Sequence, residues 1–434
     1  MAKNSIGGTS GDVGDLAGLP KRVNLGQNKK RLSGQVNAGH AHIEGDMTLG
    51  KRCITALRSS GEFSRATQGF HSYPARLHPE AARILLDALQ GESLGDPFCG
   101  GGTLLVEGLI AGRRVFGSDL NPIATLVSTA RTALLSSKQL EKLQTECEGV
   151  WNEAKKSYAE KRPVHLHPAI LKYKSWYKTN CFDELTHLYA AIRALDSELK
   201  PLIQAIFSSL VVKYSLRASD TSNKVVYIPR KNGTVLRAFR DKAKEYIEQL
   251  TELQSIVPPG TEPAQISLAD ARRPGFRQVD TIITSPPYPG TYDYLLLQQL
   301  RQAWFDLDMR NEEEIGSRRS FKQTRSAYEK WLKDTDQWMA ACAKALTKGG
   351  KMAVVVGEGM QGGRLLRVAK PTMAAAQKAG LNFVTSASVD RFDPATRMKK
   401  IEYILVFEKP DKAKKEGQSV CESQAPKSEE KGEP

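Results

Sequence analysis

The residues with the clearest chemical potential are Thr284-Ser285-Pro286-Pro287-Tyr288, which end a run of buried-type residues. Consecutive prolines fix φ and remove two amide donors, so the carbonyl oxygens of Ser285 and Pro286 become rigid hydrogen-bond acceptors. Acceptors of this kind can hold both N–H groups of an exocyclic amine and stabilise the positive charge that develops on its nitrogen during attack. Tyr288 offers a face for stacking an extruded base. In isolation, the same motif would be a surface turn with a partly buried tyrosine.

A second motif, Asp96-Pro97-Phe98-Cys99-Gly100-Gly101-Gly102-Thr103, follows a predicted strand and opens a predicted helix. Its glycines allow a ligand to approach the backbone, because a Cβ atom would collide with it. The next predicted strand ends at Asp119, whose carboxylate can accept hydrogen bonds from both hydroxyls of a ribose. Alternatively, Asp119 could be a helix N-cap. The pair of motifs predicts a site for a nucleoside cofactor, and the catalytic-type motif downstream makes that reading stronger.

Both motifs lie in a pattern of short apolar runs that alternate with helical periodicity, which predicts a mostly parallel sheet with crossover helices. The last two predicted strands could form an antiparallel hairpin that closes the sheet edge. The predicted strands are 94–98, 114–118, 280–284, 351–356, 381–387 and 401–408, and the predicted helices are 79–90, 103–111, 327–346 and 364–379.

Composition divides the chain into five regions. Residues 1–50 are predicted to form a flexible basic arm, and residues 410–434 a disordered tail, because neither has enough apolar residues to bury. Residues 60–135 and 258–409 form the two parts of the α/β domain, the cofactor half and the catalytic half. Residues 136–257 break the α/β rhythm and are predicted to form a largely helical insertion.

The formal net charge of +15 over 434 residues favours a polyanionic partner. The six cysteines are scattered and no histidine cluster has metal-ligand spacing, so we expect reduced thiols and no metal. The apolar stretches are too short to span a bilayer and the N-terminus lacks the apolar core of a secretory signal, so we expect no membrane partner and a cytoplasmic location.

Taken together, these motifs resemble the amino-methyltransferases that act on cytosine N4 or adenine N6 of nucleic acids. The resemblance is greatest to the N4-cytosine DNA methyltransferases, in which serine replaces the aspartate usual in adenine enzymes at the position of Ser285. It covers residues 70–128 and 266–407. It implies S-adenosylmethionine as cofactor and a Rossmann-like class I methyltransferase fold, with a seven-stranded, mostly parallel sheet and an antiparallel C-terminal strand. It also implies site-specific DNA methylation in a prokaryotic cytoplasm or nucleoid, with a cognate restriction endonuclease as a candidate partner.

The resemblance also implies roles for individual residues. Asp119 would bind the ribose and Asp270 the adenine amine, while a segment from Phe70 to Glu80 would close over the methionine moiety. Arg76 in that segment could meet the cofactor carboxylate, or His71 and Arg76 could fasten the segment to the sheet edge. The predicted catalytic residues are Ser285, Pro286, Pro287 and Tyr288, and the predicted cofactor-binding residues are Tyr73, Arg76, Asp96, Phe98, Gly100, Gly102, Thr103, Asp119, Asn121 and Asp270.

Two basic segments are candidates for contact with nucleic acid. The first, residues 217–244, interleaves cations with Tyr227 and Phe239, a pattern that suits phosphate contact plus stacking. The second follows the catalytic-type motif and includes Arg310, Lys322 and Arg325. Either segment could instead be a solvated surface. The candidate contacts are Lys224, Arg230, Lys231, Arg237, Arg240, Arg318 and Arg319, whereas Trp304, Trp331 and Trp338 are predicted to pack in the core.

Three other functions remain open at this point. The pocket chemistry is shared with adenine N6 enzymes, and the order of the motifs also occurs in RNA amino-methyltransferases that act on tRNA or rRNA. A protein of another class, which keeps the fold for binding without catalysis, is the third. Cys99 lies in the cofactor turn and resembles nothing in the Pro-Cys pocket of C5-cytosine enzymes, so no covalent intermediate is expected.

Overall fold

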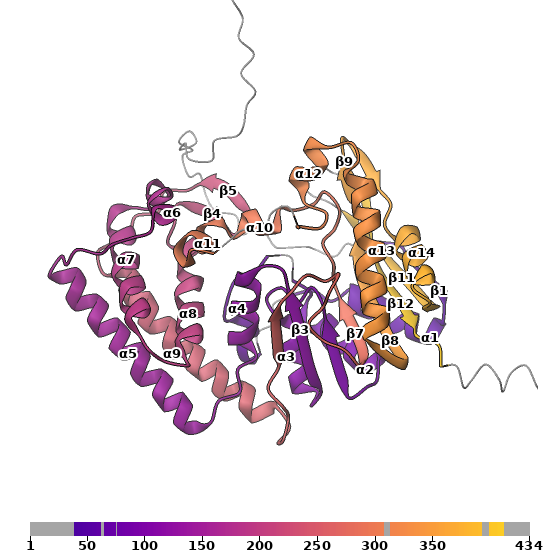
Figure 1. Ribbon diagram of the computed structural model, residues 1–434, viewed down its shortest axis with the longest axis horizontal. Coiled ribbons are helices and arrows are strands. Elements are labelled where there is room, and N and C mark those ends of the chain that lie inside the picture. The colour runs from indigo at the N-terminus through magenta and orange to yellow at the C-terminus, as the bar shows by residue number, and fades with distance from the viewer. Residues whose placement is uncertain (1–38, 62–64, 75, 308–312, 393–398, 412–434) are drawn as a thin grey trace, which may run out of the picture.

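The computed structural model describes residues 39–61, 65–74, 76–307, 313–392 and 399–411. Their centre is an eight-stranded sheet, and Figure 1 shows one group of helices beside an end of this sheet and other helices packed on its faces. In spatial order, its strands are β1 (Ala41–Gly45), β11 (Asn382–Phe392), β12 (Lys399–Glu408), β8 (Leu346–Gly357), β7 (Val279–Thr284), β2 (Ser93–Asp96), β3 (Arg114–Asp119) and β6 (Gln265–Leu268).

The directions of these strands match the predicted fold class. Strands β6, β3, β2, β7 and β8 are parallel, and β12 runs antiparallel between β8 and β11. The mostly parallel sheet with a reversed C-terminal strand is therefore confirmed, whereas the predicted number of seven strands is one too low, because β1 adds an eighth. The predicted β11–β12 hairpin is also antiparallel, but it does not close the sheet, because β1 pairs with the outer side of β11.

The N-terminal region differs from the prediction. Residues 41–45 form β1 and are followed by α1 (Met47–Leu57), although residues 1–50 were expected to be a flexible arm. Helix α1 buries Cys53 and Leu57 against the sheet, and Asp46 caps its first turn. Residues 1–38 of the expected arm, and the predicted tail beyond residue 411, lie outside the described residues.

Alternating side chains of the central strands fill two separate cores. Along β8, Met352 and Val354 face the core that α13 (Ala327–Ala345) and α14 (Ala369–Lys378) cover. Ala353 and Val355 face the opposite core, which α1 and α2 (Pro79–Ala88) cover. A strand buried on both faces is typical of a sheet between two helical layers. The predicted helix 364–379 begins only at Ala369, because β10 (Arg364–Leu366) pairs with β9 (Gly359–Gln361) as a hairpin.

Residues 137–256 form a lobe of helices, as expected, but the lobe also contains a small hairpin. Its main helices are α5 (Ser137–Ala159), α7 (Thr179–Ala194), α8 (Lys200–Lys213) and α9 (Thr234–Ile256), with the short α6 (Pro168–Leu171) and the hairpin β4 (Arg217–Ser219) and β5 (Ser222–Val225). We call this part the helical lobe. The Tyr246 ring stacks on Phe70 with 4.0 Å between ring centroids, and the Tyr246 hydroxyl donates to the carbonyl of Ala130 at 2.6 Å. The lobe is therefore packed firmly on the α/β domain.

The catalytic half of the chain also contributes to the core of the helical lobe. Trp304, on α11 (Gln299–Phe305), lies among Phe182, Tyr189 and Phe207, and its indole N–H donates to the Tyr177 hydroxyl at 3.2 Å. The buried Arg301 pairs with Asp220 of the β4–β5 turn at 2.5 Å. Trp304, Trp331 and Trp338 are all buried, which confirms their predicted packing role.

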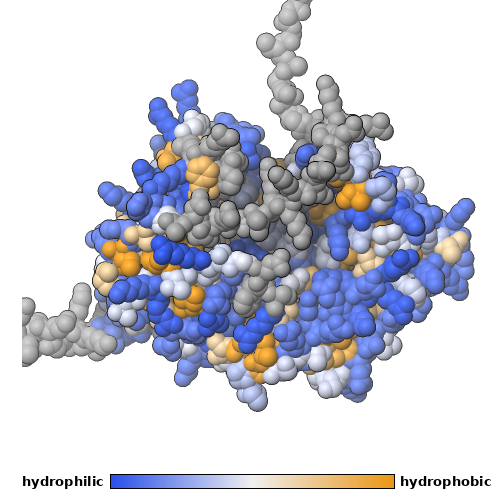
Figure 2. Space-filling model, turned by 180° about the vertical axis from the view of Figure 1, so that it is seen from behind, coloured by the Kyte–Doolittle hydropathy of each residue, from blue (hydrophilic) through white to orange (hydrophobic). Residues whose placement is uncertain are grey.

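Two general properties of the described part of the chain bear on its partners. None of its helices is long and apolar enough to cross a membrane, and it contains no group of three or more side chains suited to holding a metal ion. Figure 2 shows hydrophilic residues over most of one face, with hydrophobic residues in small scattered groups. A partner for that face would therefore meet a mainly polar surface.

We predict that Trp304→Ala destabilises the protein strongly, because the substitution leaves a cavity in an aromatic cluster. The free energy of unfolding should fall by about 3–5 kcal/mol, measured by urea denaturation. Tyr227→Ala is the matched control, since Tyr227 is 48% exposed and should change stability little. A loss below about 1 kcal/mol for Trp304→Ala would contradict the view that the two halves of the chain share one core.

Candidate active site

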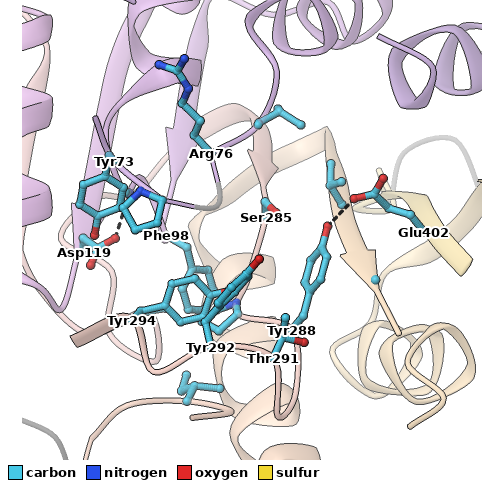
Figure 3. Close-up of a pocket in the computed structure, with 18 of the residues that line it drawn as sticks. Tyr73, Arg76, Phe98, Asp119, Ser285, Tyr288, Thr291, Tyr292, Tyr294 and Glu402 are labelled. Carbon is cyan, nitrogen blue, oxygen red and sulfur yellow. Dashed lines mark hydrogen bonds between the residues drawn. The ribbon is translucent and has the colours of Figure 1, made fainter. Parts of the chain in front are cut away.

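The carboxyl ends of β2, β3 and β7 meet at a cavity of about 560 Å³ (Figure 3). Both predicted motifs contribute to its wall, although β2 and β7 are far apart in the chain. The predicted residues that line it are Tyr73, Arg76, Phe98, Gly100, Asp119, Asn121, Asp270, Ser285, Pro287 and Tyr288. Asp96 and Thr103 line a smaller adjoining cavity of about 50 Å³, which shares Tyr73, Phe98, Gly100 and Ser285 with the larger one.

Asp119 organises the glycine turn. Its Oδ2 accepts from the backbone N–H of Gly100 at 2.9 Å, and its Oδ1 accepts from that of Asn121 at 2.9 Å. The N-cap of α4 (Pro122–Arg131) is Asn121, whose Oδ1 accepts from Ile123, so the alternative role of Asp119 as a helix cap is wrong. Burial raises the pKa of Asp119 to about 6.

The glycines of the turn have different reasons to be glycine. Gly100 has a φ of +50° and lines both cavities, whereas Gly102 has a φ of +77° and lines neither. A Cβ atom on Gly102 would lie 2.8 Å from Cβ of Ser128 on α4. Gly102, predicted to bind the cofactor, thus serves the close packing of α4 against the turn.

The segment before the turn is held over it by an arginine that the sequence did not single out. Arg131, fully buried, donates to the carbonyl of Gly101 at 2.8 Å and to that of His71. Tyr73 packs on the turn, since a Cβ atom on Gly101 would lie 2.8 Å from Cβ of Tyr73. A single arginine at the end of an amphipathic helix carries no distinctive sequence signal, so this role required the structure.

Asp96 joins the cofactor half to the catalytic half. Its Oδ1 accepts from the hydroxyl of Thr284 at 2.7 Å, and also from the backbone N–H of Phe98 at 3.1 Å. Burial raises the pKa of Asp96 to about 7. The bond therefore connects the ends of the two strands that carry the two motifs.

Ser285 and Tyr288 both face the large cavity, but their surroundings differ. Ser285 is partly exposed directly after β7, and among the described residues no hydrogen bond engages the carbonyl of Pro286. Tyr288 lies against Gly357 of β8, and its hydroxyl donates to Oε1 of Glu402 at 2.8 Å (Figure 3). Burial keeps the pKa of Tyr288 well above its usual range, so the phenol stays protonated.

Other residues of the cavity were not anticipated. Tyr292 and Tyr294 contact each other edge to face at 5.5 Å and line the wall beside Thr291. Glu314 closes the same side, accepts from the backbone N–H of Leu295 at 3.2 Å, and has a pKa raised by burial to about 7. The seven residues from Tyr288 to Tyr294 contain three tyrosines, and this was the signal that could have revealed the wall.

Two predicted residues of the cofactor site are engaged by protein partners. Arg76 donates to the carbonyl of Gln68 at 2.7 Å while still lining the cavity. Both oxygens of Asp270 accept from Arg272, at 2.5 to 3.0 Å, which leaves less of the carboxylate for an adenine amine. The sheet-edge alternative for His71 is not what the structure has, because its Nε2 contacts the Ser208 hydroxyl of α8 at 3.0 Å.

The basic segments divide into structural and exposed residues. Phe239 is fully buried in the lobe core, so the expectation that it stacks on a base is wrong. Arg230 stacks on Tyr214, and Arg240 stacks on Trp151 and pairs with Glu148. Arg319 is partly buried, with its backbone N–H on Asp293, and Arg310 lies outside the described residues. The exposed cations are Lys224, Lys231, Arg237, Arg240, Lys244, Arg318, Lys322 and Arg325, of which Arg240 and Lys244 pair with glutamates of the lobe.

The residues of the turn fit a nucleoside cofactor. Gly100 lines both cavities, where a Cβ atom would lie 3.3 Å from Cε1 of Tyr73, and Asp119 keeps acceptor capacity beyond its two backbone bonds. The Thr103 hydroxyl is buried at the adjoining cavity and has no hydrogen-bond partner among the described residues. With the sheet order described above, these features define a class I, Rossmann-like methyltransferase fold.

Comparisons with known proteins agree with this class. Residues 279–434 match the DNA methylase family of N6 and N4 methyltransferases, and residues 70–238 match the RMKL-like methyltransferase domain. These matches confirm the predicted resemblance to the N4/N6 amino-methyltransferases and, with it, the predicted cofactor, S-adenosylmethionine.

Individual relatives are more distant. The chain is 26% identical over 270 residues to the Type II methyltransferase M.MvaI of Kocuria varians. The matched region covers 57% of this chain and 60% of that protein. Among solved structures it is similar to TrmN from Thermus thermophilus, with 13% identity and a TM-score of 0.28 over 76% of this chain and 48% of that one. It is also similar to the rRNA methyltransferase aviRa from Streptomyces viridochromogenes, with 15% identity and a TM-score of 0.32 over 78% and 88%.

The raised pKa of Asp96 predicts a pH-dependent stability. Between about pH 4 and pH 7 the unfolded chain loses this proton while the folded protein keeps it, so stability falls as the pH rises through that range. Asp96→Asn keeps an acceptor for Thr284 and removes the ionisable group. The decline in the free energy of unfolding should therefore be smaller in the variant, by up to about 4 kcal/mol.

Urea denaturation at several pH values from 4 to 8 measures this difference. Asp87→Asn, on the exposed surface of α2, is the control and should keep the wild-type slope. Equal slopes for wild type and Asp96→Asn would show that Asp96 ionises normally in the folded protein.

Proposed function

We propose that this protein is a site-specific DNA methyltransferase that transfers a methyl group from S-adenosylmethionine to the exocyclic amino group of a base, with cytosine N4 as its target. One observation carries the proposal. Ser285, Pro287 and Tyr288 line the same cavity as Gly100 of the glycine turn and Asp119, and Pro286 is buried between them in the chain. Amine acceptors and a nucleoside site are thereby brought within one enclosed space.

The protein groups would divide the work between binding and orientation. When bound, S-adenosylmethionine supplies an electrophilic methyl group. Asp119 would accept from the ribose hydroxyls, and the glycine turn would support the rest of the nucleoside from its backbone. In place of the Ser285 carbonyl suggested by the sequence, the Ser285 hydroxyl would act with the Pro286 carbonyl. The two would accept the N–H groups of the target amine, which directs the nitrogen lone pair and stabilises its developing charge. Tyr288 would stack on the extruded base.

The choice of cytosine rests on Ser285. The resemblance places a serine there in the N4-cytosine enzymes and an aspartate in the adenine enzymes. Because both groups supply one oxygen acceptor for an amine, the two activities share the rest of the pocket, and adenine N6 is the alternative outcome. A nucleic-acid substrate also implies the cytoplasm or nucleoid as its setting, and a cognate restriction endonuclease remains a prediction.

DNA as the substrate is supported by the family match and by charge. In Figure 1 the β4–β5 hairpin of the helical lobe and α12 (Arg318–Gln323) stand on either side of the region towards which the carboxyl ends of the parallel strands point. Exposed cations lie on both, with Lys224 on the hairpin and Arg318 on α12. We infer that a nucleic acid lies between them, with its phosphates neutralised from two sides.

The product of the reaction tests the proposal directly. Wild-type protein, incubated with methyl-labelled cofactor and separate DNA and RNA pools, should label DNA, and mass spectrometry of its nucleosides should find 4-methylcytosine. Ser285→Ala should lower kcat by about 10²-fold, because an acceptor that acts in the transition state is lost. Ser255→Ala, on the exposed face of α9, is the control.

Each other outcome identifies a different substrate. Only 6-methyladenine would move the target to adenine N6, and label confined to RNA would replace DNA as the substrate. Unchanged activity in Ser285→Ala would remove this residue from the chemistry. An absence of transfer to either pool, together with tight nucleic-acid binding, would favour a protein that binds without catalysis.

Asp119 predicts how cofactor affinity depends on pH. Ribose hydroxyls donate to the ionised carboxylate of Asp119, whereas burial raises the pKa of this carboxyl to about 6 in the protein without cofactor. Binding below that pH must expel a proton, so affinity should rise with pH up to about 6, by as much as about tenfold per pH unit, and then level off. Asp119→Asn should bind more weakly and without this slope.

Isothermal titration calorimetry with S-adenosylmethionine between pH 5 and pH 8 measures the effect. Asp241→Asn, on the exposed surface of α9, should behave like wild type. Wild-type binding that is flat across this range would argue against Asp119 as the ribose acceptor.

A further inference from the structure

A chain of hydrogen bonds runs from Tyr288 along the wall of the cavity, which Glu402, Arg391 and Leu57 also line. The Tyr288 hydroxyl donates to Oε1 of Glu402 at 2.8 Å, as Figure 3 shows. The other oxygen of Glu402 accepts from Nε of Arg391 at 2.8 Å and lies 2.7 Å from its Nη2. Arg391 also donates to the carbonyl of Leu57, the last residue of α1, at 2.5 Å. Both oxygens of Glu402 are thus committed to defined partners.

The register of the sheet explains why these residues act together. Glu402 on β12 lies directly opposite Gly357 on β8, and Val389 on β11 lies opposite Glu402 on its other side. Arg391, two residues beyond Val389, is a diagonal neighbour of Glu402 on the same face of the sheet. Three adjacent strands therefore present Gly357, Glu402 and Arg391 on one face.

The Tyr288 ring packs directly on the backbone at Gly357. A Cβ atom on Gly357 would lie 2.5 Å from Cε2 and 2.9 Å from Cδ2 of Tyr288, closer than carbon atoms can pack. One side of the ring therefore lies on the backbone of β8, while the tyrosine also lines the cavity that Ser285 faces. Any larger residue at position 357 would push the ring into the cavity.

The Ser-Pro-Pro-Tyr motif does not by itself fix the orientation of the Tyr288 ring. The two prolines fix the backbone up to Pro287, but they do not constrain the side-chain torsions of Tyr288. A stacking side chain binds its ligand most effectively when its orientation is fixed beforehand, because binding then costs no further side-chain conformational entropy. Packing on Gly357 and the hydrogen bond to Glu402 constrain the side-chain torsions of Tyr288.

We propose that Glu402 is a positioning residue, which, with Arg391 behind it and Gly357 below the ring, holds Tyr288 in the one orientation that stacks the target base beside Ser285 and Pro286. The inference deepens the proposed function and rests on it. Because the phenol hydroxyl is already bonded to Glu402, Tyr288 contacts the base through its ring face. Stacking is tolerant of base identity, so the choice of base falls to the acceptors and to the Tyr292, Tyr294 and Glu314 wall.

Three variants test this role on the full-length protein. Glu402→Ala removes the acceptor, Tyr288→Phe removes only the donor hydroxyl, and Glu402→Gln keeps an acceptor oxygen. Glu402→Ala and Tyr288→Phe should each lower kcat/KM for DNA roughly tenfold, with the affinity for S-adenosylmethionine unchanged. Glu402→Gln should recover most of the activity. The double variant should be no worse than either single one, because both remove the same bond.

A signal from base extrusion separates positioning from a general structural effect. DNA with 2-aminopurine at the target position should gain fluorescence on binding wild-type protein, and this gain should be smaller with Glu402→Ala and Tyr288→Phe. Glu408→Ala, at the far end of β12, is the matched control and should leave fluorescence and activity unchanged. Thermal unfolding of every variant checks that the fold is intact.

The outcomes distinguish this inference from the proposed function. If wild-type protein methylates DNA and Glu402→Ala matches it in kcat/KM and fluorescence, Glu402 does not position Tyr288. Additive losses in the double variant would likewise overturn the inference, because Glu402 would then act independently of Tyr288. If Glu402→Ala does not fold, Tyr288→Phe and Glu402→Gln carry the same comparison. Failure of wild-type protein to methylate or extrude any DNA base would instead contradict the proposed function.

Discussion

Strands β2 and β7 lie side by side in the sheet although Asp96 and Thr284, at their carboxyl ends, are 188 residues apart in the chain. The hydrogen bond between these two side chains keeps the strand ends level, and the glycine turn and the Ser-Pro-Pro-Tyr segment leave the sheet from those two points. The pairing of these two central strands creates the cavity. Its shape is then adjusted by Arg131, by the packing of Tyr288 on Gly357, and by the wall of Tyr292 and Tyr294.

Three of the acids at this space resist ionisation. Asp119 and Glu314 line it, Asp96 lines the small adjoining cavity, and burial raises the pKa of each. Carboxyl groups in a poorly solvated cavity favour a ligand that brings positive charge, because such a ligand offsets the cost of ionising them. A sulfonium cofactor has that property. The same residues that shape the pocket therefore bias it electrostatically towards its ligand before any specific contact is formed.

The sequence predicted the parts of the site that depend on local pattern. The glycine turn, Asp119 and Ser285 to Tyr288 each follow a recognisable strand, and parallel strands bring such ends together. It could not predict Glu402 or Arg131, because both act through partners distant in the chain: Tyr288 is 114 residues from Glu402, and Gly101 and His71 are 30 and 60 residues from Arg131. The same limit explains β1, whose five residues pair with the distant β11, and Phe239, whose basic neighbours suggested exposure while its own helical face packs inward.

The position of Trp304 has a consequence for protein engineering. Residues of the catalytic half, just beyond Tyr288, complete the core of the helical lobe, and Arg301 is paired with Asp220 in its hairpin. The helical lobe therefore cannot be removed or exchanged as an independent unit. Exchanging it between related enzymes would leave an aromatic side chain and a buried cation without their surroundings. Any exchange of the lobe would have to include α11, so that Trp304 and Arg301 keep the residues they pack and pair with.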